Sequence, residues 1–173
     1  MDGGVPWPRI TLITPSYNQA AYIERTIRSV LLQGYPNLEY IIMDGGSTDG
    51  SVEIVRKYSS WISHWESQKD SGQSHAINKG LARATGTVVN WLNSDDMLMP
   101  GALAGVARLQ AANPACVAWA GGCRRVDAKG RLIVVYRPKG LTRDEMADWY
   151  FQGYVAQPAC FFSLEASRKV GPV

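Results

Sequence analysis

Short apolar runs rich in β-branched residues recur through the first half of the chain. They cover residues 9–14, 38–43 and 87–92, and runs of this length and composition are typical of buried strands. A weaker run at 61–66 predicts a short additional strand. The first run stops at Pro15, which has no amide hydrogen for a strand ladder. The pattern therefore predicts three well-defined strands and one short strand.

Between these runs, apolar residues recur at the three- and four-residue spacing of an amphipathic helix. This spacing predicts helices over residues 23–31 and 74–84, one capped near Thr48 or Asp49, and one beyond Pro100. Strands that alternate with helices through short loops predict an α/β fold. We expect a mainly parallel, Rossmann-like sheet with right-handed connections and helices on both faces, in three layers.

The second half of the chain has a more mixed pattern. Residues 116–120 and 131–136 read as strands, and a turn at 127–130 precedes the second of them. With 173 residues, of which 46% are apolar, the chain can bury one core. We expect residues 1–8 to form a tail and residues 9–173 to form one domain.

Charge and composition exclude several classes of function. The net charge of +3, from 18 basic and 15 acidic residues, predicts no nucleic-acid partner, although it is compatible with a mild attraction to an anionic surface. No run approaches the roughly 18 to 20 apolar residues of a membrane span, and the first nine residues lack signal-peptide features. We therefore expect a cytoplasmic protein. Cys116, Cys123 and Cys160 are interpreted as small core residues.

Candidate chemistry gathers in the loops that follow the predicted strands, where open α/β sheets bind their ligands. Asp95 and Asp96 lie in the segment 93–96, at the end of the strand predicted at 87–92. Two adjacent carboxylates repel each other unless a cation neutralises them, and carboxylate oxygens suit Mg²⁺ or Mn²⁺. The alternative is a turn or helix cap before Met97.

Asp44 leads into a glycine-rich loop after the second strand. Its carboxylate either shapes that turn or accepts hydrogen bonds from a nucleobase or a ribose, with Gly45 and Gly46 allowing close approach of the backbone. No lysine followed by serine or threonine stands at the spacing of a phosphate-binding P-loop.

Two further loops carry weaker signals. Pro15, Ser16 and Tyr17 either line a base pocket or simply pack and punctuate the chain. Lys79 is either a phosphate ligand or a solvated helix residue. His75 is interpreted as a hydrogen-bonded helix residue and not as a catalyst.

Taken together and in order, these motifs closely resemble the family 2 glycosyltransferases. The resemblance spans essentially the whole chain and rests on residues 13–18, 41–50, 69–73, 76–80 and 91–96. It implies a glycosyltransferase-A fold and a UDP-, GDP- or dTDP-linked sugar donor. It also implies transfer to an acceptor hydroxyl with inversion, with Mn²⁺ or Mg²⁺ bridging the diphosphate.

The resemblance also implies roles for individual residues. Asp96 and Asp95 would bind the metal, and Asp95 would also contact the ribose or the donor sugar. The expected donor-binding residues are Pro15, Ser16, Tyr17, Asp44, Gly45, Asp70, Asn78, Lys79 and Asp95. The acceptor would be a glycan or a lipid-linked glycan in surface polysaccharide or glycoconjugate synthesis, which makes peripheral association with the inner face of the membrane compatible with this function.

The catalytic base is the part of the pattern that the sequence does not supply. Relatives place a carboxylate beyond the segment equivalent to residues 157–162, and no such motif follows here, so we expect a shortened chain without its base. Asp144, Glu145 and Asp148 read as the solvated face of a helix. Two alternatives stay open: a non-catalytic nucleotide-sugar-binding module, and a sugar nucleotidyltransferase, although the basic glycine-rich loop of the latter is absent.

Overall fold

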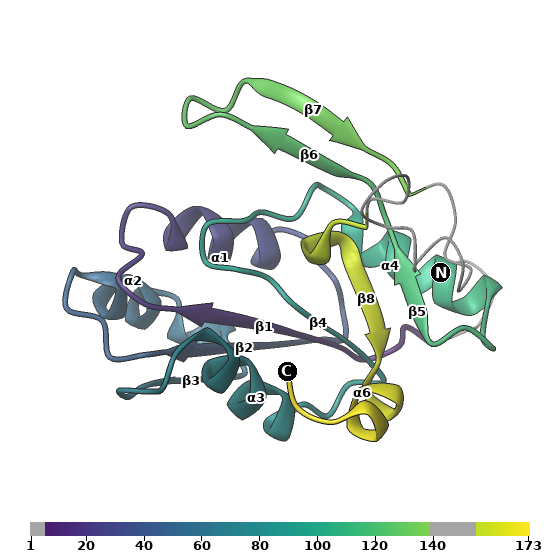
Figure 1. The fold of residues 1–173 in the computed structure, drawn as a ribbon, viewed down its shortest axis with the longest axis horizontal. Coiled ribbons are helices and arrows are strands. Elements are labelled where there is room, and N and C mark those ends of the chain that lie inside the picture. Colours follow the sequence, from purple (N-terminus) through teal and green to yellow (C-terminus); the bar gives the residue numbers. More distant parts are fainter. Residues whose placement is uncertain (1–5, 139–154) are drawn as a thin grey trace.

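A computed structural model of the chain describes residues 6–138 and 155–173. Its centre is a six-stranded sheet with the strand order β3-β2-β1-β4-β8-β5 (Figure 1). The strands of this sheet are β1 (Ile10–Ser16), β2 (Leu38–Asp44), β3 (His64–Ser67), β4 (Val88–Trp91), β5 (Ala118–Ala120) and β8 (Cys160–Ser163). The four strands predicted from the first half of the chain are thus confirmed.

The first four strands form a parallel block with β1 in its interior. Ile10 pairs with Leu38 of β2 on one side and with Val88 of β4 on the other. The sheet is not parallel throughout, because β8 runs antiparallel to both β4 and β5. The sequence analysis did not predict β8, which has only four residues and follows directly on a short 3-10 helix, η2 (Gln157–Ala159).

Helices cover both faces of the sheet, as predicted. One core cluster joins the sheet to α1 (Ile23–Leu31), α2 (Ser51–Lys57) and α4 (Ala102–Ala112). A second cluster joins the opposite face to α3 (Gln73–Arg83) and α6 (Leu164–Val170). The three-layer arrangement is therefore confirmed.

The ends of three elements differ slightly from expectation. β1 does not stop at Pro15 but continues to Ser16, with Pro15 paired to Met43. The residue that precedes α2 is Gly50, with φ of 97°, and not Thr48 or Asp49. Asp49 still supports the helix start, because its carboxylate accepts hydrogen bonds from the amide and hydroxyl of Ser51. A 3-10 turn, η1 (Ser59–Trp61), replaces the start of the strand predicted at 61–66.

A separate hairpin stands apart from the main sheet (Figure 1). It consists of β6 (Cys123–Val126) and β7 (Leu132–Tyr136), which pair antiparallel with an irregularity at Arg125/Val126. The sequence analysis predicted β7 and its preceding turn, but not β6 or its separation from the core sheet. The cysteine interpretation was wrong for Cys116, which is exposed, while Cys123 and Cys160 are half-buried free thiols.

The chain before β1 is attached to the core. Trp7 stacks edge-on against Tyr35 at 5.2 Å between ring centroids, and the Tyr35 hydroxyl donates to the Pro8 carbonyl at 2.7 Å. The boundary predicted at residue 9 stays a prediction. None of the helices in the described parts of the chain has the length and apolar character needed to cross a membrane.

Candidate functional site

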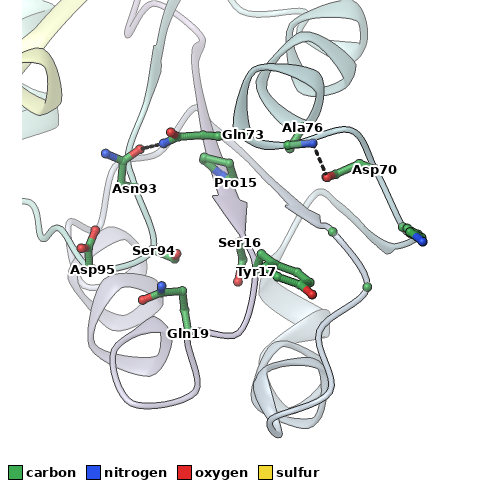
Figure 2. A pocket seen from close by; sticks show the side chains of 14 residues that line it. Pro15, Ser16, Tyr17, Gln19, Asp70, Gln73, Ala76, Asn93, Ser94 and Asp95 are labelled. Atoms are coloured by element: carbon green, nitrogen blue, oxygen red, sulfur yellow. Dashed lines mark hydrogen bonds between the residues drawn. The ribbon is translucent and has the colours of Figure 1, made fainter.

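A cavity of about 760 Å³ lies at the carboxyl ends of the parallel strands (Figure 2). Its walls come from the loops that follow β1, β2, β3 and β4, together with the first turn of α3. This is where an open α/β sheet places its ligand site. The lining residues are Pro15, Ser16, Tyr17, Gln19, Gly45, Gly46, Lys69, Asp70, Gly72, Gln73, Ala76, Asn93, Ser94 and Asp95.

Most of the predicted donor-binding residues meet at this cavity, and three do not. Those in the lining are Pro15, Ser16, Tyr17, Gly45, Asp70 and Asp95. Asn78 instead exchanges two hydrogen bonds with the backbone of Val173. Lys79 forms an ion pair with Glu66, and its hydrogen bond is the main cause of the lowered pKa of Glu66. Asp44, the third, lies beneath the cavity.

The carboxylate of Asp44 is buried and holds the turn after β2. It accepts hydrogen bonds from the Gly46 amide at 3.1 Å, from the Ser47 amide at 2.9 Å and hydroxyl at 2.5 Å, and from the Ser67 hydroxyl at 2.6 Å. These contacts correspond to the turn-shaping alternative. They tie the ends of β2 and β3 together under the cavity floor.

Two close approaches in the same region depend on glycine. A Cβ on Gly45 would lie 3.0 Å from the Asp70 carboxylate, so the loops after β2 and β3 abut. Gly46 has φ of 86°, and a Cβ there would lie 3.1 Å from the Lys69 amide. A side chain at either position would press into the loop that carries Asp70 and Lys69.

The loop after β1 is held by Asn18, which has φ of 52°. Asparagine tolerates this left-handed conformation better than most residues. Its amide donates to the Ser47 hydroxyl at 2.8 Å, and its side-chain oxygen accepts from the Thr48 amide at 2.9 Å. This fixes the backbone next to Tyr17, whose side chain is 62% exposed at the cavity.

Several polar residues at the cavity were not assigned from the sequence. Gln73 at the start of α3 donates to the Asn93 carboxamide at 2.8 Å, which links α3 to the end of β4 (Figure 2). The Gln19 side-chain oxygen is buried without a hydrogen-bond partner, and so is the hydroxyl of Ser16, which the sequence did assign to donor binding. Buried polar atoms are normally paired, so unpaired ones in a cavity wall mark places where a ligand supplies the partner. The sequence signal that could have pointed to Gln19 is its position in the loop that follows the first strand.

Lys69 is the basic side chain among the cavity-lining residues of the described chain. Lys79, by contrast, is absent from the lining and is paired with Glu66. His75 lies in α3 and its Nδ1 accepts a hydrogen bond from the Ser71 amide at 3.1 Å. This confirms the interpretation of His75 as a hydrogen-bonded helix residue.

Asp95 and Asp96 follow β4, with Asp95 in the cavity wall and Asp96 half-buried behind it. Burial, and then the charge of Asp95, raise the pKa of the Asp96 carboxyl. Burial, and then the charge of Asp96, raise the pKa of the Cys123 thiol, so the base of the β6–β7 hairpin lies near this carboxylate. Across residues 6–138 and 155–173, no basic side chain forms an ion pair with either aspartate.

The two carboxylates suit a divalent cation held jointly with a diphosphate. No cluster of three or more His, Cys, Asp or Glu side chains that could hold a metal alone occurs in the part of the chain that the structure describes. Mg²⁺ commonly binds through one or two carboxylates plus substrate phosphates, and Mn²⁺ accepts the same oxygen ligands. A half-buried carboxylate that has a carboxylate neighbour, and no basic partner among the described residues, fits that arrangement.

Comparison with known proteins identifies the family. Residues 11–170 match the model for glycosyl transferase family 2. The chain belongs to the family 2 glycosyltransferases. This confirms the resemblance on which the sequence analysis relied.

The relatives are longer proteins. The chain is 45% identical over 92 residues to the putative teichuronic acid biosynthesis glycosyltransferase TuaG of Bacillus subtilis, covering 51% of this chain and 36% of that protein. It is 30% identical over 141 residues to the GalNAc(5)-diNAcBac-PP-undecaprenol beta-1,3-glucosyltransferase of Campylobacter jejuni, covering 79% and 45%. The chain thus spans less than half of these two curated relatives.

The fold is also shared with solved glycosyltransferases. The mannosyltransferase PcManGT from Pyrobaculum calidifontis, solved with GDP-Man and Mn²⁺, superposes with a TM-score of 0.71 at 23% identity. The superposition covers 98% of this chain and 51% of that one. The glycosyltransferase-A, Rossmann-like fold expected from the sequence is therefore confirmed.

Proposed function

We propose that this glycosyltransferase domain binds a nucleotide-diphosphate sugar in the cavity and, with a divalent cation, transfers the sugar to an acceptor hydroxyl with inversion. The observation that carries the proposal is the position of Asp95 in the wall of the same cavity as the loops after β1, β2 and β3, with the half-buried Asp96 next to it in the chain. Family membership supports the donor class, and the PcManGT complex with GDP-Man and Mn²⁺ supports both donor and metal.

The nucleoside end of the donor would lie against Tyr17 and Asp70. The exposed Tyr17 ring offers a face for stacking, and the Asp70 carboxylate, which already accepts from the Gly72 amide at 2.9 Å, offers an acceptor for a base N–H. Ser16 and Gln19 each leave a buried oxygen for a ligand hydroxyl. Asp44 would contribute by holding the shape of the floor.

The diphosphate end would lie between Lys69 and the aspartate pair. Lys69 provides one positive charge at the cavity, and Asp96, with Asp95 beside it, would hold Mn²⁺ or Mg²⁺. When bound, that cation would stabilise the negative charge that develops on the leaving diphosphate. The role of the chain is to orient the donor and to hold the cation against it.

The acceptor end of the reaction needs a base that takes the hydroxyl proton. The carboxylates that line the cavity of the described chain are Asp70 and Asp95, and the proposal already uses both for the donor. Asp144, Glu145 and Asp148 lie outside the described residues, so their interpretation as a solvated helix face stays a prediction. We leave the base unassigned.

The names of two relatives guide the choice of acceptor and location. The name of TuaG refers to teichuronic acid biosynthesis, and the name of the Campylobacter relative refers to an undecaprenol-linked glycan. We propose a glycan or lipid-linked glycan as the acceptor, and action in the cytoplasm at the inner face of the membrane.

Calorimetric titration with UDP, GDP and dTDP, each with and without Mn²⁺, tests donor binding. We expect one nucleoside diphosphate to bind at least about tenfold more tightly with Mn²⁺ present, a gain of about 1.4 kcal/mol. The absence of binding by all three nucleotides with Mn²⁺ would refute the proposal.

Product analysis separates the alternatives. Nucleoside diphosphate released from a nucleotide-sugar in the presence of an acceptor marks a transferase, whereas pyrophosphate released from a nucleoside triphosphate marks a nucleotidyltransferase. Metal-dependent binding with neither product marks a non-catalytic module.

A further inference from the structure

We propose that the β6–β7 hairpin is a docking element for a membrane surface that contains anionic lipids. Strands β6 and β7 pair with each other and not with the six-stranded sheet. The hairpin that they form projects from the rest of the domain (Figure 1). It carries both a concentration of positive charge and exposed aliphatic side chains. This inference does not depend on the identity of the sugar donor.

The charge of the chain is concentrated on this hairpin. Residues 123–137 contain five basic residues, Arg124, Arg125, Lys129, Arg131 and Arg137, and one acidic residue, Asp127. The whole chain has 18 basic and 15 acidic residues. The hairpin together with the adjoining Arg137 is therefore net +4, and the remaining 13 basic and 14 acidic residues leave the rest of the chain at −1. The excess of positive charge therefore lies on this one element.

One face of the hairpin combines this charge with aliphatic surface. Arg124 pairs directly with Val135, so their side chains share a face. Ile133 lies at the register irregularity of the hairpin, and Arg137 follows the end of β7. Ile133 is 59% and Val135 is 42% exposed, and both arginines are exposed. Leu132, 58% exposed, and Val126, 41% exposed, extend the apolar surface toward the turn.

A lipid surface matches this combination better than a purely ionic partner does. Anionic headgroups attract arginines, and the headgroup–acyl boundary accepts aliphatic side chains while the guanidinium groups stay among the headgroups. A nucleic-acid backbone would satisfy the arginines but would leave Ile133 and Val135 in water. Isolated two-stranded hairpins are only marginally stable in water, so contact with a surface also stabilises the element.

The hairpin is connected to the candidate site. It begins at Cys123, whose thiol lies near the Asp96 carboxylate. Docking of the hairpin would hold the aspartate pair close to the membrane, where a lipid-linked acceptor would be presented.

Vesicle co-sedimentation of the whole chain tests the proposal, with neutral phosphatidylcholine vesicles and vesicles containing phosphatidylglycerol. We expect binding to the anionic vesicles that weakens with salt. Arg124→Glu with Arg137→Glu should lower the partition coefficient at least about tenfold. Ile133→Ser with Val135→Ser should lower the binding that persists at high salt. Arg25→Glu with Arg108→Glu makes the same charge change at exposed positions of α1 and α4 and should have a smaller effect.

Circular dichroism and Mn²⁺-dependent nucleotide binding, measured on each variant, show that the fold and the donor site are intact. The proposal is overturned if the chain does not bind anionic vesicles, or if the control pair lowers binding as much as the hairpin pair. Binding of a single-stranded RNA probe in preference to the anionic vesicles would also overturn it. Loss of nucleotide binding without loss of vesicle binding would count against the proposed donor site alone.

Discussion

The hydroxyl oxygen of Thr26 lies 2.7 Å from the backbone carbonyl oxygen of Asp96, across 70 residues of sequence. The same hydroxyl lies 2.8 Å from the Ser94 carbonyl oxygen, and the Thr26 side chain is buried in α1. One side chain of α1 therefore fixes the backbone on both sides of Asp95. The direction of the aspartate pair depends on this contact as well as on the strand that precedes it.

Replacement of Thr26 by valine should weaken metal-dependent binding while leaving both aspartates in place. Valine has nearly the same shape but removes the single hydroxyl hydrogen that the carbonyl oxygens of Ser94 and Asp96 share, which costs about 1 to 3 kcal/mol. We expect a lower unfolding midpoint and a smaller Mn²⁺-dependent gain in nucleotide affinity, with the metal-independent affinity less affected. Thr26→Ser keeps the hydroxyl and should restore the gain. Equal losses with and without Mn²⁺ would show that the residue is only structural.

The contact between α3 and β1 depends on the absence of a side chain at Gly80. A Cβ there would lie 2.5 Å from Cγ2 of Ile13, which is fully buried. Gly80→Ala should therefore destabilise the domain by about 1 to 3 kcal/mol through overpacking. Gly105→Ala is the matched control, because no atom beyond its chain neighbours and its own helix backbone lies within 4 Å of its Cβ position in α4, and it should stabilise by about 0.5 to 1 kcal/mol. Urea unfolding measures both, and equal effects would contradict the packing account.

Asp44→Asn tests whether this carboxylate holds the turn or contacts the ligand. Asparagine keeps one acceptor oxygen, but its NH2 group cannot accept, so it cannot accept both the bonds at Asp44 Oδ2, from the Gly46 and Ser47 amides and the Ser67 hydroxyl, and the bond at Oδ1 from the Ser47 hydroxyl. We expect a loss of about 1 to 3 kcal/mol in unfolding free energy. Glu53→Gln, at an exposed position of α2, should change it little. Unchanged stability together with lost nucleotide binding would instead assign Asp44 to direct ligand contact.

The raised pKa of Asp96 gives the metal-free protein a defined pH dependence. The folded chain keeps the Asp96 proton to a higher pH than the unfolded chain, because burial and the charge of Asp95 disfavour the carboxylate. Protonated Asp96 therefore contributes to the free energy of unfolding at pH values below 3.8, the ordinary pKa of an aspartate. This contribution is lost as the pH rises through the pKa of Asp96 in the folded chain.

Asp96→Asn removes this titration. In urea unfolding without metal, the wild type should therefore lose stability relative to the variant as pH rises through that window. A difference between the two proteins that does not vary with pH would contradict the assigned cause.

The predictable part of the fold is the part with local signals. β-branched runs before Pro15 and Asp44 predict strands. The loops that follow these strands meet because the carboxyl ends of parallel strands lie at the same edge of the sheet. Strand β8 and the separation of the hairpin depend on contacts between distant segments, such as Ala118 with Phe162. No local pattern encodes that pairing.

The site divides in the same way. Residue type and position after a strand pointed to Tyr17 and Asp95, which line the cavity. They did not show that Asp44 is occupied by four internal hydrogen bonds, or that Lys79 is held by Glu66, because these partners come from other strands and loops. Thr26 could not be assigned from the sequence for the same reason, because a threonine on the buried face of a helix is ordinarily interpreted as a packing residue.

The most direct test of the account is calorimetric titration of the nucleoside diphosphate that binds best, with and without Mn²⁺, on the wild type and Asp96→Ala. Glu53→Ala serves as a control that removes an exposed carboxylate outside the cavity lining. We predict that Asp96→Ala abolishes the Mn²⁺-dependent gain, keeps the weaker metal-independent binding, and leaves the fold intact, while Glu53→Ala binds as the wild type does. An undiminished Mn²⁺-dependent gain in a folded Asp96→Ala protein would contradict the assignment of the metal to this aspartate pair.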